Sequence, residues 1–102
     1  MDKGGLLSND MKVACEIYRH NEDKKEPIWF AKLSEILENE MLRSAVSRSL
    51  DKLSDWGIVK REHGETEGGR AGRLLYIANE PKDTIKSVYE EFWKRRDPND
   101  ES

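Results

Sequence analysis

The chain has 102 residues, 35% of them hydrophobic and 38% charged. This length and composition fit one compact domain with a modest core and exclude two full domains. The 18 basic and 21 acidic side chains nearly balance, which excludes a uniformly basic nucleic-acid coat, and the net charge of −3 by itself argues against DNA binding.

The charge is not spread evenly along the chain. Residues 1–42 hold 6 basic and 9 acidic side chains, residues 43–73 hold 7 and 5, and residues 74–102 hold 5 and 7. The middle third is therefore the net-positive part of the sequence. A surface that attracts nucleic acid is expected there.

Cysteine content and hydropathy indicate the compartment. Cys15 is the single cysteine, so no disulfide can form within the chain and a reducing, cytoplasmic location is expected, with a bridge between two chains left open. No apolar run approaches the roughly 18 residues of a membrane span. The first ten residues also lack the apolar stretch of a signal peptide, so no membrane partner is expected.

Two helices are predicted in the first 40 residues. The first spans 8–20, with Ser8 or Asn9 as N-cap, and the charged run that follows it predicts a loop. Its apolar stripe is Met11, Ala14, Ile17 and Tyr18. The second spans 28–38, and Ile28 and Trp29 either start it or form a short strand. Its apolar face is Phe30, Leu33, Ile36 and Leu37.

A third helix is predicted over 42–56, with Gly57 as its C-terminal stop. Its apolar stripe is Leu42, Val46, Leu50 and Leu53. If this stripe packs on the first two helices, a polar face points outward near the N-terminal half of the helix. That face consists of Arg43, Ser44, Ser47, Arg48 and Asp51.

A β-hairpin and a last helix complete the predicted elements. The hairpin spans 58–78, with a long, mobile, glycine-rich tip and a returning strand at RLLYIA, and Trp56 is expected to pack at its root. The last helix spans 81–96, with Pro81 at its first position, and residues 98–102 form a flexible tail.

The stretch MLRSAVSRSLDKLSDWGIVKRE, followed by GGRAGRLLYIANEP, resembles the core of winged-helix transcriptional regulators of the MarR, ArsR and PadR kind. The resemblance covers roughly residues 28–80. It implies a single winged helix-turn-helix domain over residues 1–97, mainly helical, with a small hairpin (the wing) and an additional C-terminal helix. It also implies a homodimer that reads a pseudo-palindromic operator, with recognition helices in successive major grooves about 34 Å apart.

Serine hydroxyls and arginine guanidinium groups suit this role, because they can bind base edges or phosphates in the major groove. The residues expected to contact DNA are Arg43, Ser44, Ser47, Arg48, Lys52, Lys60, Arg61, Arg70 and Arg73. Acidic residues in the same region repel phosphates and argue against tight non-specific binding of DNA. They are Asp51, Asp55, Glu62, Glu65 and Glu67.

The apolar stripe of the last helix needs a partner, either the first helix of the same chain or the same helix of a second copy. The residues expected at a dimer contact are Ile85, Val88, Tyr89, Phe92 and Trp93.

The sequence also bears on two other functional classes. An enzyme is not expected, because His20 and His63 fall in different predicted loops and no metal-binding, nucleotide-binding or cofactor motif is present. The rival to DNA binding is a winged helix that binds protein within a larger complex, which the acidic balance favours. The operator, any small-molecule effector and the sense of regulation are not encoded in a readable pattern.

Overall fold

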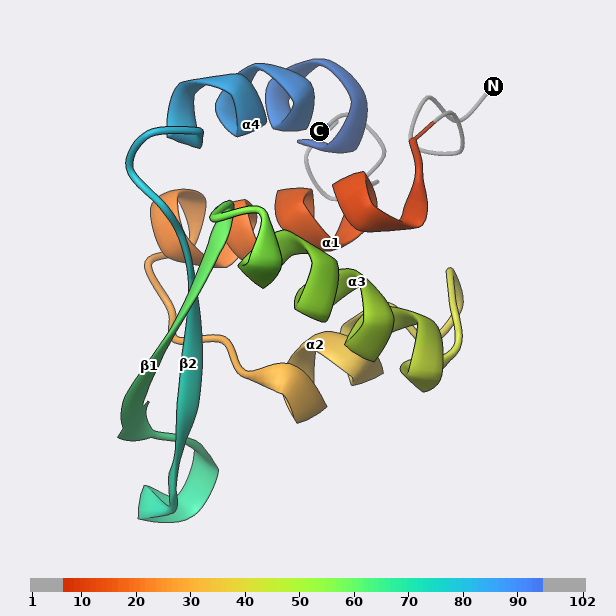
Figure 1. Cartoon of the computed structure of the whole chain (residues 1–102). Coiled ribbons are helices and arrows are strands. Elements are labelled where there is room, and N and C mark those ends of the chain that lie inside the picture. The colour runs from red at the N-terminus through yellow and green to blue at the C-terminus, as the bar shows by residue number, and fades with distance from the viewer. Residues whose placement is uncertain (1–6, 95–102) are drawn as a thin grey trace, which may run out of the picture.

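The computed structural model describes residues 7–94, which form helices and one two-stranded hairpin (Figure 1). The helices are α1 (Asn9–Tyr18), which continues into a π-helical turn (Arg19–Asp23), α2 (Phe30–Ile36), α3 (Arg43–Asp55) and α4 (Lys82–Val88), which continues into a second π-helical turn (Tyr89–Trp93). The strands are β1 (Val59–Glu65) and β2 (Ala71–Ile77), paired antiparallel. This architecture confirms the predicted fold class.

Helix α1 lies at the centre, with α4 on one side and α3 and α2 on the other (Figure 1). Ser8 caps it, because its hydroxyl accepts a hydrogen bond from the Met11 amide at 3.2 Å. Every side chain from Val13 to Tyr18 is buried, so α1 is surrounded by protein rather than packed along one stripe.

The end of α1 differs from the prediction. Helical structure continues to Asp23, and His20 is a buried helical residue rather than a loop residue. Asn21 bridges to β2: its Nδ2 donates to the Leu75 carbonyl at 3.1 Å, and its Oδ1 accepts from the Ile77 amide at 2.9 Å. These contacts with β2 stabilise a polar turn that local sequence would favour as loop.

The segment before α2 adds a short extended piece to the hairpin. Trp29 forms a β-bridge with Leu74, and the Leu75 amide donates to the Ile28 carbonyl at 2.9 Å. Residues 28 and 29 are therefore strand-like, and the helix predicted from residue 28 begins at Phe30.

Helix α3 buries Val46, Leu50 and Leu53, as predicted, together with Ser49. Gly57 ends it in the left-handed region (φ 76°), which glycine adopts without strain. Two expectations were wrong. Leu42 is the N-cap, with extended backbone, and is 76% exposed, while Trp56 is the C-cap and is 63% exposed rather than packed at the root of the hairpin.

The hairpin is more regular than predicted. Its strands extend to Glu65 and resume at Ala71, so only residues 66–70 form the tip. The Thr66 amide donates to the Arg70 carbonyl at 2.8 Å and closes the turn. The hairpin extends beyond the helices as an arm (Figure 1).

Helix α4 and its π-helical turn dock on α1 of the same chain. Ile85, Tyr89 and Trp93 are each 2% exposed, so these three predicted dimer residues belong to the core. Val88 and Phe92 remain partly exposed. Pro81 is the N-cap rather than the first helical residue, while the predicted positions 95–96 and the tail 98–102 lie outside the described residues.

A buried polar cluster fastens this docking. Glu16 accepts from the Trp93 indole Nε1 at 2.9 Å, and its other oxygen lies 3.0 Å from His20 Nε2. Burial opposes ionisation of Glu16, but the hydrogen bonds with His20 and Trp93 and the Arg19 charge outweigh it and lower its pKa. Burial, with the Glu16 charge, raises the pKa of the neighbouring Cys15 to about 12. Cys15 is fully buried, so the folded chain cannot form the interchain bridge that the sequence left open.

Candidate nucleic-acid interface

The outward face of α3 carries the polar side chains that the sequence singles out. Ser44, Ser47 and Arg48 are all exposed, while the buried positions lie on the opposite side of the helix. Arg43, at the first position of α3, lies over the Phe30 ring with its guanidinium carbon 4.8 Å from the ring centroid. This stacking holds the Arg43 guanidinium beside the start of the helix.

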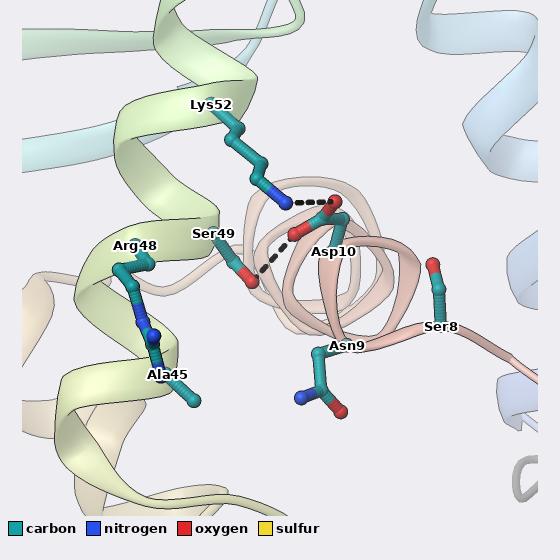
Figure 2. Close-up of a pocket in the computed structure, with 7 residues that line it drawn as sticks. All are labelled: Ser8, Asn9, Asp10, Ala45, Arg48, Ser49 and Lys52. Carbon is teal, nitrogen blue, oxygen red and sulfur yellow. Dashed lines mark hydrogen bonds and ion pairs between the residues drawn. The ribbon is translucent and has the colours of Figure 1, made fainter.

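A polar groove of about 330 Å³ separates the first turn of α1 from α3 (Figure 2). Ser49 Oγ donates to Asp10 Oδ1 at 2.6 Å, and Lys52 Nζ lies 3.7 Å from Asp10 Oδ2. Figure 2 shows both side chains reaching from α3 toward Asp10, whereas Arg48 runs along the outside of α3. Asp10 thus engages one predicted DNA-binding cation and leaves Arg48 directed outward.

Arg61 links the hairpin to α3. Its Nη2 lies 2.9 Å from Asp51 Oδ1, and its Nε donates to Ser54 Oγ at 3.0 Å. The carboxylate that seemed to oppose DNA binding is therefore bound by a predicted DNA-binding cation of the same chain. Arg61 positions the hairpin against α3, and its charge is already partly satisfied.

The register of the hairpin separates its basic residues into two faces. Arg61 is paired with Leu75 and His63 with Arg73, and alternation along the strands places these four on the same face. Lys60, paired with Tyr76, lies on the opposite face. The structure therefore brings Arg73 onto the face that meets α3 and does not bring Lys60 there.

The tip of the hairpin carries one predicted site residue. Arg70 is exposed, beside Gly68 and Gly69, whose positive φ values (74° and 76°) shape the turn. The tip lies at the far end of the arm, away from the helices (Figure 1).

Two partners of this face were missed in the sequence, Asp10 and Ser49. Ser49 occupies a position on the buried stripe of α3, which predicts that its hydroxyl needs a hydrogen-bond partner. Helical periodicity does not reveal that the partner is at the start of α1, 39 residues earlier.

Within residues 7–94, no group of three or more His, Cys, Asp or Glu side chains is arranged to hold a metal ion. No helix in this range is long and apolar enough to cross a membrane.

Comparison with known proteins identifies the fold. No protein-family model and no curated protein matches the sequence. Among solved structures, the crystal structure of Pex from Synechococcus sp. (strain PCC 7942) superposes with a TM-score of 0.58, at 18% identity, over 86% of this chain and 84% of that chain. The chain has a winged-helix fold. In this winged helix, α2 and α3 form the helix-turn-helix, the β1–β2 hairpin is the wing and α4 is the additional C-terminal helix, as the resemblance in the sequence implied.

Proposed function

We propose that this winged helix is a sequence-specific DNA-binding transcriptional regulator that acts as a homodimer on double-stranded DNA. The observation that carries the proposal is the exposure of Ser44, Ser47 and Arg48 on the outer face of α3, while the other face is buried in the core. An exposed helix on a rigid support is what the major groove admits.

The dimensions and chemistry of α3 support this role. A 13-residue helix is about 20 Å long, and the major groove of B-DNA is about 12 Å wide. Arg48 can bind a guanine edge through two hydrogen bonds or clamp a phosphate, and serine hydroxyls can donate to or accept from either base of a pair. The side chains of the outer face thus suit base reading.

The wing supplies a second contact region. Arg73 shares the α3-facing side of the hairpin, and Arg70 lies at its tip. Arginines on such an arm can reach backbone phosphates or the adjacent minor groove. Because Arg61 and Lys52 are engaged by Asp51 and Asp10, Arg48 and Arg73 are the cations expected to contribute most.

The acidic residues of the same region shape the expected binding. Asp55, Glu62 and Glu65 are exposed near α3 and the wing. Their repulsion from phosphates weakens binding to arbitrary duplexes, so affinity should depend on sequence rather than on bulk charge.

The test uses duplexes selected by the protein from a random pool, followed by titrations at increasing salt. Affinity should fall steeply with salt, and Arg48→Ala combined with Arg73→Ala should abolish measurable binding. Lys86→Ala, which removes an exposed cation on α4, is the matched control and should bind like the parent protein. If no duplex is bound in a salt-dependent manner, the proposal fails.

Dimerisation needs a separate test, because three of the five residues expected at the dimer contact are buried in the core of the same chain. Val88 and Phe92 are the partly exposed members of the predicted dimer set. Val88 also packs on the hydrophobic core and is left unchanged. Replacing Phe92 with aspartate should leave the fold intact and give a monomer by light scattering, since a charged side chain disfavours an apolar contact. A dimer that persists in this variant would show that the dimer contact lies on another surface.

A protein-binding winged helix is the second candidate. It is favoured by the net charge of −3 and by Trp56, which is 63% exposed at the end of α3. Exposed tryptophan is a common anchor of protein interfaces. Absence of duplex binding together with a protein complex that Trp56→Ala disrupts would favour this candidate.

A further inference from the structure

Within residues 7–94, Leu42 is the most exposed of the large apolar side chains, at 76%. It precedes the first residue of α3 and is followed by the exposed residues Arg43 and Ser44. An apolar side chain in this place contributes little to the core.

The Leu42 side chain does not cap the start of α3 either. It occupies the N-cap, where Ser, Thr, Asp or Asn would satisfy a free amide, and no side-chain cap is formed there. The same chain does cap α1 in this way, with Ser8. Neither burial nor capping therefore accounts for a leucine at this position.

The backbone that carries Leu42 is held firmly. Met41 is buried, and its amide donates to the Leu37 carbonyl at 3.0 Å. The Leu42 carbonyl accepts from the Ala45 and Val46 amides at 2.9 and 3.1 Å. Glu40, the residue before Met41, forms an ion pair with α1: its Oε2 lies 3.2 Å from Lys12 Nζ. The leucine is thus presented to solvent from a fixed position.

We propose that Leu42 reads a thymine by packing on its C5-methyl group in the major groove. This inference rests on the proposed function. Thymine is the base that presents a methyl group in that groove, and apolar contact is how proteins recognise it. Arg43 and Arg48 on the same helix suit the negative potential that surrounds such a methyl group.

The surroundings favour a base over a protein partner. Between Leu42 and Trp56, the exposed side chains of α3 are polar or charged, and the two apolar residues lie at opposite ends of a helix about 20 Å long. A protein interface would require a continuous apolar centre, which α3 does not offer.

The test replaces thymines of a selected duplex, one at a time, with deoxyuridine, which removes only the methyl group. For the parent protein, one thymine in each half-site should weaken binding about fourfold when replaced, the worth of one buried methyl group. For Leu42→Ala, that replacement should have no effect. Ile36→Ala, which truncates another exposed apolar side chain, is the control and should retain the full methyl dependence.

The outcomes separate the two proposals. If duplexes are selected but no thymine replacement matters, or if Leu42→Ala keeps the same methyl dependence, the role of Leu42 is overturned while DNA binding stands. If no duplex is selected, both proposals fail. Leu42→Asn provides a folding check, because this capping residue should hold or raise thermal stability while binding weakens.

Discussion

Arg61 of β1 and Asp51 of α3 form an ion pair at 2.9 Å, and the same guanidinium donates to Ser54 Oγ at 3.0 Å. One side chain of the wing therefore contacts two positions one turn apart on α3. These two contacts fix the position of the wing relative to α3 before any partner binds. A partner that contacts both elements therefore binds a preorganised surface.

The first prediction concerns the strength of this link. Because Asp51 is 66% exposed, solvent screens the pair, and a double-mutant cycle with Arg61→Ala and Asp51→Ala should give a coupling energy of about 0.5–1 kcal/mol in the free energy of unfolding. Denaturant titration of the four proteins measures it. A coupling of zero would show that the pair is not held in solution.

The second prediction concerns the docking of the C-terminal helix. Trp93→Ala should lower the free energy of unfolding by about 3–5 kcal/mol, because it opens a cavity and removes the indole donor to Glu16. Phe92→Ala, at the neighbouring, partly exposed position, is the control and should cost clearly less. Equal losses at both positions would contradict the placement of this turn.

The third prediction concerns pH. The pKa of Glu16 is lowered from 4.5 in the folded chain, so the unfolded chain binds a proton more readily and the folded state gains stability above this pH. That contribution is lost as pH falls below about 4.5 and through the folded-state pKa. In denaturant titrations, Glu16→Gln should therefore show a shallower loss of stability on acidification than the parent protein. Parallel pH curves for the two proteins would refute this role.

The fourth prediction concerns the thiol. Cys15 is fully buried and its pKa is raised to about 12, so iodoacetamide should leave the native protein unmodified at neutral pH and alkylate it fully in denaturant. Mass spectrometry distinguishes the two states. Rapid modification of the native protein would show that α1 opens readily.

Local pattern predicted much of this fold. The aliphatic repeat of α3 and its glycine stop placed the helix over 42–56, against the observed Arg43–Asp55, and the β-rich run after the glycines placed the returning strand. Periodicity succeeds here because one face of each element is buried and the other is solvated.

The parts of the fold that the sequence did not predict depend on contacts between residues far apart in the chain. His20 and Asn21 read as loop residues because their partners, Glu16 and the backbone of β2, become apparent only in the fold. The stripe of the last helix likewise could not reveal that α1 of the same chain covers three of its five members.

The sequence predicted which residues lie in the candidate site but not the ion pairs that they form with other elements. The exposed serines and Arg48 followed from the helical period. The engagement of Lys52 by Asp10 and of Arg61 by Asp51, and the placement of Lys60 on the far face of the wing, depend on how α1, α3 and the hairpin pack together.

If the outer face of α3 and the α3-facing side of the wing bind duplex DNA, amide chemical shifts should change there when a selected duplex is added to the labelled protein. We expect large shifts by NMR at Ser44, Ser47, Arg48 and Arg73, with Lys86 on α4 unchanged. Shifts confined to α4 or to the surroundings of Trp56, or no shifts at all, would contradict it.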